Sequence, residues 1–285
     1  MALNNFIPQV WSARLLENLE KNHVFAGVAS RTYEGEIRAY GDQVKINSIG
    51  PITIGSYTKN TDINAPETLT DAQRILNIDQ AKYFNFQIDD IDAAQTSPKV
   101  MDGAMRAAAY ALSDTADSYL AGLHTQAAAE NLIGTDASPI TFAEAGDAYA
   151  YLVKLAVKLD EANVPQNGRW VVVPAWFHAL LLLDPRFVQA GSAASDRVLR
   201  VGEVGEAAGF TILTSNNVAK VEDGFKVMAG AENTIAYAEQ ITELCAYRPE
   251  KRFADALKGL HLYGAKVVEP KSLAVLTVAR PVELA

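Results

Sequence analysis

The chain is poor in the residues that build metal sites and disulfides. Of its 285 residues, one is a cysteine and four are histidines. The single cysteine, Cys245, can form neither an intrachain disulfide nor a multi-cysteine zinc site. The histidines, His23, His124, His178 and His261, show no metal-ligand spacing and no His-Glu-x-x-His motif. We therefore predict no metal and no cofactor.

Long hydrophobic runs are also absent. The most apolar stretch, Val171 to Leu183, is shorter than the ~20 residues that a transmembrane helix needs, and it contains Pro174 and His178. The N-terminus has neither the basic start nor the apolar core of a signal peptide. We therefore expect no membrane partner and synthesis in the cytoplasm.

Basic charge is scarce relative to acidic charge. The 25 Lys and Arg residues are outnumbered by 34 Asp and Glu residues, which gives a net charge of −9. This balance argues against a protein whose main task is to grip nucleic acid. The content of 49% hydrophobic and 21% charged residues is typical of a folded globular chain. The length allows a sizeable core in one large domain or two smaller ones.

Catalytic and ligand-binding motifs are missing. There is no Gly-x-Ser-x-Gly nucleophile elbow and no Walker phosphate loop. One glycine set superficially resembles a dinucleotide loop: Gly202, Gly205 and Gly209. It lacks the Gly-x-Gly start, so we interpret it as a strand or turn junction. One acidic set could bind a divalent cation: Asp89, Asp90 and Asp92. It lacks the glycine and distal glutamate of a calcium loop, so we predict a solvated junction.

The most distinctive segment is a long amphipathic stretch from Pro98 to Ala129. Ser97 can cap it and Pro98 fits its first turn. Its apolar face is formed by Met101, Met105, Ala108, Leu112, Thr115, Tyr119 and Leu123. Its opposite face is formed by Lys99, Asp102, Arg106, Ser113, Asp114 and Asp117. At ~1.5 Å per residue the helix would be about 48 Å long, a structural strut whose only late breaker is Gly122.

Residues 36–88 have the pattern of a long two-stranded excursion. Apolar residues alternate on both arms, at Val44, Ile46, Ile52, Ile54, Ile75, Ile78, Phe84, Phe86 and Ile88. The stretch between the arms, Ser56 to Asp71, is polar and forms a predicted tip. An isolated two-stranded hairpin is marginal in water, so we expect support from outside it, such as another subunit.

The second half alternates helical and extended patterns. Thr141 and Glu144 form a capping box that predicts a helix to about Ala162. A buried strand from Arg169 to Pro174 precedes a helix over Ala175 to Leu183. Further strands are predicted at residues 210–213, 225–230, 234–238, 243–248, 260–268 and 273–279. Cys245 falls in one of these, where we expect a small buried side chain. The chain is therefore a mixed α+β protein.

In this order of elements, the chain resembles the major capsid protein of tailed bacteriophages, with the Hong Kong 97-type fold. The resemblance spans about Phe6 to Val278. The motifs that carry it are Gly41 to Val44, Phe84 to Asp92, Arg169 to Pro174, Asp184 to Phe187, Gly202 to Ile212 and Ser215 to Asn217. Long, locally unsupported arms also suit a protein whose subunits overlap, because each arm buries its edges and apolar area against a neighbour.

The resemblance implies a division of the chain. Residues 1–40 would be the N-terminal arm and 41–92 the E-loop. Residues 93–139 and 240–285 would form the P-domain, with 98–129 as its spine helix and the last strand returning to the axial sheet. Residues 140–239 would form the A-domain.

The resemblance also implies a function and partners. Hexamers and pentamers would close into an icosahedral shell around double-stranded DNA, made in the bacterial cytoplasm and located in the virion. Scaffolding protein, portal and decoration proteins would be partners, with the scaffold a separate protein. No enzymatic role is implied. Some members join an E-loop lysine to an asparagine of another subunit. Lys59 is placed for this, but no motif identifies its partner, so we expect no crosslink.

The expected subunit-contact residues are Trp11, Ile52, Ile54, Tyr57 and Lys59. Trp11 lies in a short amphipathic pattern near the N-terminus, where it can fold back on its own core or contact a neighbouring chain.

Two alternatives remain at this stage. One is an encapsulin-type compartment with the same fold around protein cargo. The other is an α+β enzyme that uses Asp89, Asp90 and His178 as acid–base groups.

Overall fold

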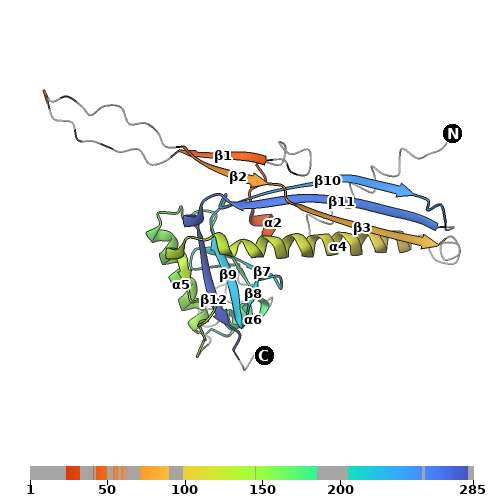
Figure 1. Ribbon diagram of the computed structural model, residues 1–285. Coiled ribbons are helices and arrows are strands. Elements are labelled where there is room, and N and C mark those ends of the chain that lie inside the picture. The colour runs from red at the N-terminus through yellow and green to blue at the C-terminus, as the bar shows by residue number, and fades with distance from the viewer. Residues whose placement is uncertain are drawn as a thin grey trace.

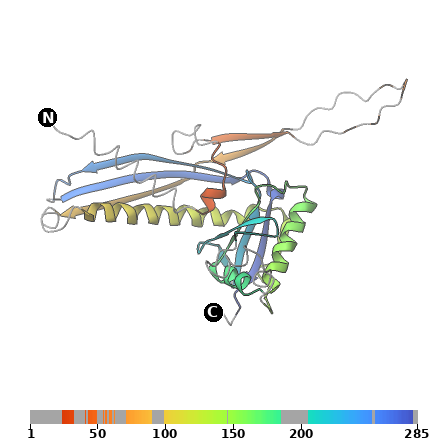
Figure 2. The same cartoon turned by 180° about the vertical axis from the view of Figure 1, so that it is seen from behind.

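The structure is a computed structural model that describes most of the chain. The described residues are 24–32, 41, 43–49, 54, 56, 59–60, 62, 71–89, 99–144, 146–184, 205–251 and 254–281. They form an elongated layer joined at one end to a compact part, and a two-stranded hairpin lies at that same end (Figure 1 and, from behind, Figure 2).

The elongated layer is an antiparallel sheet covered by one long helix. Its strands are β3 (Gln80–Asp89), β10 (Ile235–Tyr247) and β11 (Ala254–Val267), in the order β10-β11-β3. Helix α4 (Lys99–Ala121) runs along one face (Figure 1). Side chains from the helix and all three strands pack between them: Met105, Ala109, Leu112, Leu257, Phe84, Phe86 and Leu244. The predicted strut is thus the support of a sheet.

Helix α4 is shorter than the sequence pattern predicts. It ends at Ala121, and the chain continues as a 3-10 helix, η2 (Gly122–Gln126), and then a second, η3 (Ala129–Asn131). The change of helix type coincides with Gly122, which has a low α-helix propensity. The prediction of one helix to Ala129 is therefore wrong over its last turns.

The polar face of α4 is only partly exposed. Ser113 and Asp117 are buried, whereas Arg106 and Asp114 are exposed. The short helix α2 (Phe25–Val28) lies against α4 and packs beside Ala116 and Leu120. The prediction that Asp117 is a surface residue is wrong because a segment remote in sequence covers it.

The hairpin base rests on its own chain. Strands β1 (Gln43–Ile49) and β2 (Asp71–Asn77) pair antiparallel. Their inward side chains pack on β10 and β11, in a cluster of Val44, Ile46, Leu76, Ile78, Ala236, Ala238 and Leu262. The crossing is close: a Cβ at Gly264 would lie 2.1 Å from the Asn77 carbonyl oxygen. The base is therefore supported from outside the hairpin, as expected, and this support comes from β10 and β11 of the same chain.

The compact part is a seven-stranded mixed sheet. Its order is β4-β12-β9-β5-β7-β6, with β8 paired to β9. The strands are β4 (Leu132–Ile133), β5 (Trp170–Val173), β6 (Glu206–Ala207), β7 (Phe210–Thr214), β8 (Lys220–Val221), β9 (Gly224–Gly230) and β12 (Leu273–Ala279). The last predicted strand, 273–279, thus lies in this sheet and not in the long one. The β6–β7 turn contains Gly209, with φ +80°.

The compact sheet has a core on each face. On one face, helices α5 (Gly146–Glu161) and α6 (Ala175–Leu183) pack against Val171, Val173 and other strand residues. On the other face, Trp170 and Val172 pack with α2, the end of α4, and the ends of β10 and β11. Because strand side chains alternate, the single strand β5 contributes to both cores and joins the compact part to the elongated layer.

Two further local predictions are wrong. Helix α5 begins at Gly146, not at a Thr141 capping box, and the carboxylate of Asp147 accepts hydrogen bonds from the backbone N–H groups of Ala143 (2.8 Å) and Glu144 (3.1 Å). Cys245 is exposed. Its neighbour in β10, Leu244, packs on the face of the sheet that α4 covers, so Cys245 is on the uncovered face. The alternating sequence pattern cannot show which face of a strand is covered.

Candidate functional site

Residues 24–32 are fastened to the long helix. The backbone N–H of Val24 donates a hydrogen bond to Oδ2 of Asp117 at 3.1 Å. Burial raises the pKa of Asp117 from 3.8 to about 6, although the backbone amides of Val24, Phe25 and Ala26 oppose the shift. The nearby charge of Asp114 adds to the rise. A buried carboxylate therefore positions the start of this segment.

The same segment is fastened a second time, at the edge of β10. Ser30 forms a parallel bridge with Ala236, through Ser30 N–H to the Ile235 oxygen (2.8 Å) and Tyr237 N–H to the Ser30 oxygen (3.0 Å). Arg31 pairs with the buried carboxylate of Glu239 at 2.9 Å. The segment therefore occupies part of the free edge of β10.

Glu239 is the centre of a buried polar cluster. Besides pairing with Arg31, it accepts hydrogen bonds from the hydroxyl of Tyr237 (2.7 Å) and contacts Nε2 of His261 at 3.1 Å. Burial and the charge of Glu239 raise the pKa of Tyr237 well above its usual range. The ring of His261 also contacts that of Tyr263, with ring centroids 5.0 Å apart and the planes tilted by 38°. This cluster joins β10, β11 and the N-terminal segment.

The predicted contact residues lie mainly outside the described residues. Trp11, Ile52 and Tyr57 are in this group. Ile54 is described and its side chain is 94% exposed. Lys59 is also exposed, in a turn beside Asn60, whose φ is +65°. The structure therefore leaves Ile54 uncovered and brings neither residue into the core.

A groove between β3 and α4 was not predicted. It encloses about 410 Å³ and is lined by Ala81, Lys82, Tyr83, Phe84, Ala108, Ala111, Leu112 and Thr115. We call it the β3–α4 groove. Ala108 and Thr115 belong to the predicted apolar face of the helix, but the sheet ends at β3 and does not cover them fully. The periodicity of a helix cannot show where the neighbouring sheet ends.

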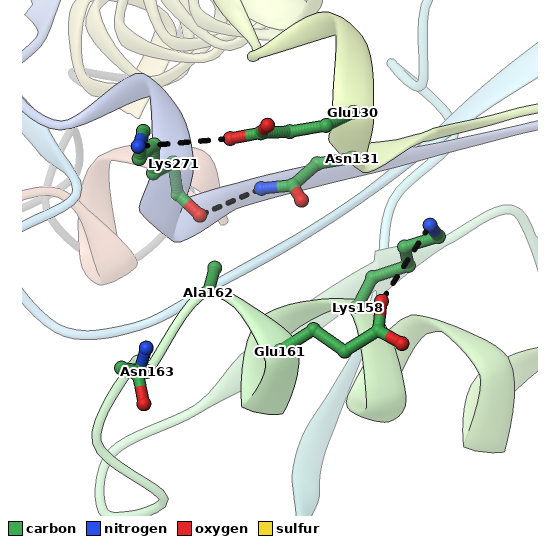
Figure 3. A pocket seen from close by; sticks show the side chains of 7 residues that line it. All are labelled: Glu130, Asn131, Lys158, Glu161, Ala162, Asn163 and Lys271. Atoms are coloured by element: carbon green, nitrogen blue, oxygen red, sulfur yellow. Dashed lines mark hydrogen bonds and ion pairs between the residues drawn. The ribbon is translucent and has the colours of Figure 1, made fainter.

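A second hollow lies between the end of α5 and the chain around η3 and η4 (Pro270–Ser272) (Figure 3). It encloses about 270 Å³ and is lined by Glu130, Asn131, Lys158, Glu161, Ala162, Asn163 and Lys271. Its charges pair with each other, Lys271 with Glu130 at 3.9 Å and Lys158 with Glu161 at 3.7 Å. The amide of Asn131 donates to the backbone oxygen of Lys271 at 2.6 Å. The lining holds no serine, threonine or cysteine and no imidazole.

The acid–base residues of the enzyme alternative are not brought together. Asp89 is at the end of β3, remote from the compact part, whereas His178 lies in α6 within it (Figure 1). Asp90 lies outside the described residues. Within the described ranges, no three His, Cys, Asp or Glu residues are grouped to hold a metal ion. No helix in the same ranges is both long and apolar enough to cross a bilayer.

Comparison with known proteins decides the family. A profile of the family described as "Phage capsid protein" matches residues 73–276. The chain belongs to this family. This capsid protein is also similar to a solved structure from Mycobacterium phage Che8, with 30% identity over 89% of this chain and 90% of the other, at a TM-score of 0.74. No curated protein sequence matches it.

More distant solved structures share the fold. The capsid of cyanophage P-SCSP1u matches at 17% identity over 91% of this chain and 89% of the other, with a TM-score of 0.72. A virus-like particle from Pyrococcus furiosus matches at 14% identity over 95% and 99%, with a TM-score of 0.56. The predictions of an α+β Hong Kong 97-type fold and of a structural major capsid protein of a tailed phage, located in the virion capsid, are confirmed.

Proposed function

We propose that this capsid protein assembles into hexamers and pentamers that close into an icosahedral shell around double-stranded DNA. The main supporting observation is the uncovered side chain of Ile54, 94% exposed between the two arms of a hairpin whose base is firmly packed. An apolar side chain held out in this way gains free energy when a neighbouring copy covers it. Many such weak contacts stabilise a closed shell through multivalency.

In this proposal the chain is divided into four parts, two of which are built around the long sheet and the compact sheet. Residues 1–40 form the N-terminal arm, and 41–92 form the E-loop, of which β3 runs along the long sheet. Residues 93–139 and 240–285 form the P-domain around α4, β10 and β11. Residues 140–239 form the A-domain, and its sheet also takes in β12.

The subunit contacts in this proposal are Trp11, Ile52, Ile54, Tyr57 and Lys59. Ile54 and Tyr57 contribute apolar area, and Lys59 contributes a charge without forming a covalent crosslink. Trp11 contacts the neighbouring chain.

We propose no enzymatic activity and a set of protein partners. These are a scaffolding protein, a portal and decoration proteins. The net charge of −9 suits a shell that encloses DNA without sequence-specific or tight binding, because strong phosphate contacts would oppose packaging and release.

The decisive experiment is to purify the chain, with and without co-expressed scaffold, and to inspect it by size-exclusion chromatography and negative-stain microscopy. Rings, shells or tubes are expected. Deletion of Tyr57 to Thr70 should leave the circular dichroism spectrum unchanged and abolish assembly. A strictly monomeric chain with measurable turnover would refute the function, and normal shells from the deletion variant would refute the role of the loop.

A second candidate is a compartment of the encapsulin type. The shared fold with the Pyrococcus furiosus virus-like particle favours this alternative, and at 14% identity it does so through fold alone. The contents of purified particles distinguish the two: nuclease-protected DNA supports the phage capsid, and a co-purifying protein cargo supports the compartment.

A further inference from the structure

We propose that Asn167 is a site of spontaneous covalent modification, at which the side-chain amide is lost through a cyclic imide formed with the backbone nitrogen of Gly168. The products are aspartate and isoaspartate at this position. The reaction needs only the folded subunit and water, so the proposal goes beyond the proposed function and does not depend on it.

The reaction is a cyclisation followed by a hydrolysis. The backbone N–H of Gly168 gives up its proton to hydroxide, and the nitrogen attacks the Cγ atom of Asn167. A bond forms between this nitrogen and Cγ, and the bond from Cγ to the side-chain nitrogen breaks, which releases ammonia. Water then opens the imide at either carbonyl group. Cleavage of the new N–Cγ bond leaves aspartate, and cleavage of the original peptide bond leaves isoaspartate, in which the main chain runs through Cγ.

The first observation is that the two reacting groups are exposed and unbonded. Asn167 and Gly168 lie in the turn between α5 and β5, and both are exposed to water. Within the part of the chain that the structure describes, no group accepts a hydrogen bond from the N–H of Gly168, and the side-chain amide of Asn167 has no partner. No hydrogen bond therefore has to break before the nitrogen and Cγ meet.

The second observation is that the chain is anchored on both sides of this pair. The N–H of Glu232 donates to the oxygen of Gly168 at 3.1 Å. The guanidinium of Arg169 donates to the backbone oxygens of Pro165 (2.9 Å) and Val164 (2.6 Å). Gly168 has φ +70° and no side chain that could shield its nitrogen. The anchors hold the ends of the turn and leave the reacting pair free.

The third observation is that other asparagines in turns are protected. Val164, which follows Asn163, donates its N–H to the oxygen of Leu159 at 3.0 Å, and its branched side chain crowds the nitrogen. Two further asparagines are followed by a bonded N–H: Asn216, whose next amide donates to Ser215 Oγ (3.1 Å), and Asn233, whose next amide donates to the Ala231 oxygen (3.2 Å). The structure thus favours Asn167 over these positions.

The modification would change charge and chain length at one point. It adds a negative charge beside Glu232, which lies so close that a Cβ at Gly168 would be 3.2 Å from Oε2. Isoaspartate also inserts a methylene group into the main chain. Because Arg169 is buried and holds the base of the turn, we expect the change to stay in the turn and the fold to survive.

The first test uses Asn163 as an internal control. Trypsin releases both asparagines in one peptide, Leu159 to Arg169. The folded protein is aged at mildly alkaline pH in water labelled with heavy oxygen, and the peptide is sequenced by mass spectrometry. We expect Asn167 to take up the label at least about tenfold faster than Asn163, whose next amide must first break a hydrogen bond. An unmodified Asn167, or equal rates at the two positions, would overturn the proposal.

The second test asks whether the fold leaves the site reactive. The rate at Asn167 in the folded chain should lie within about threefold of the rate in urea, because no hydrogen bond protects it. A folded chain that reacts more than about tenfold slower would overturn the proposal. Val164→Gly is the matched control, because it creates a second Asn-Gly pair whose amide is still bonded to Leu159. In this variant, folding should slow Asn163 by about tenfold. Equal folded and unfolded rates at Asn163, with an unchanged circular dichroism spectrum, would overturn the structural explanation.

The third test follows the charge of the intact protein. On ageing, isoelectric focusing should show a growing acidic species in the wild type and in Asn163→Gln, whereas Asn167→Gln should lose most of it. The same acidic species at the same rate in Asn167→Gln would overturn the proposal. None of these outcomes bears on assembly, so the proposed function is tested separately.

Discussion

Val24 and Asp117 are 93 positions apart, yet the backbone N–H of one donates a hydrogen bond to the buried carboxylate of the other at 3.1 Å. Together with the Arg31–Glu239 ion pair, this contact holds residues 24–32 against both α4 and β10. The segment is thus an integral part of the folded subunit, and the chemistry that holds it is open to direct tests.

The raised pKa of Asp117 predicts an unusual dependence of stability on pH. The folded-state pKa is about 6 and the ordinary value is 3.8, so the native state binds the proton more tightly. The stabilisation that this tighter proton binding gives the folded state is fully present below about pH 4 and is lost as the pH rises through 6. It amounts to about 3 kcal/mol at most. Asp117→Asn removes this titration. We therefore expect the stability of the variant relative to the wild type to increase between pH 4 and pH 6.5 in urea unfolding. Parallel pH profiles would contradict the assignment.

Loss of the Glu239 carboxylate should be costly. Glu239→Ala removes the acceptor for Arg31, Tyr237 and His261 in a largely buried site, so we expect a loss of about 2–4 kcal/mol in the free energy of unfolding. The matched control is Glu130→Ala, which breaks the exposed pair with Lys271 and should cost less than about 0.5 kcal/mol. A loss for Glu239→Ala as small as the one expected for Glu130→Ala, measured by denaturant unfolding, would show that the cluster is not stabilising.

The hairpin base should depend on the absence of a side chain at Gly264. Gly264→Ala would place a Cβ 2.1 Å from the Asn77 oxygen, so backbone must shift, and we expect a loss of about 3 kcal/mol or more. The control is Gly103→Ala in α4, where no atom lies within 4 Å of the new Cβ. This change should stabilise the protein by roughly 0.5–1 kcal/mol. Thermal melts measure both, and limited proteolysis between residues 43 and 77 reports detachment of the hairpin.

Ile54 offers a test that separates assembly from folding. Ile54→Asp alters a side chain that is 94% exposed, so the free energy of unfolding should stay within about 0.5 kcal/mol of the wild type. The yield of shells should fall, because a charge replaces the apolar contact. Ser56→Asp introduces the same charge at an exposed polar neighbour and should assemble normally. Equal yields from the two variants would remove Ile54 from the interface.

Much of the fold could be predicted from local patterns. The buried strand at Trp170–Val173 and the helix that follows it are present where the sequence placed them. The alternating pattern at Phe84, Phe86 and Ile88 also forms a strand, β3, but this strand pairs with β11 in the long sheet and is not an arm of the predicted hairpin. These elements are specified by short-range periodicity and by turn residues, which a sequence displays directly. The predicted strands at 234–238 and 243–248 prove to be one strand, β10, with an irregularity between Ile241 and Glu243.

The misses share a physical cause: each depends on what covers a surface. Asp117 has the pattern of an exposed residue and is buried by α2, whereas Cys245 has the pattern of a buried residue and is exposed. The β3–α4 groove exists because the sheet stops at β3. Tertiary cover is set by segments distant in sequence, and periodicity within one segment carries no information about it.

The shared strand β5 has a mechanical consequence. Val171 and Val173 belong to the core under α5 and α6, while Trp170 and Val172 belong to the core that includes the end of α4. Neither core can loosen without exposing side chains of the same strand, so the described body should melt in a single transition. A change in the shape of the subunit should therefore move the compact part together with the adjoining ends of α4, β10 and β11.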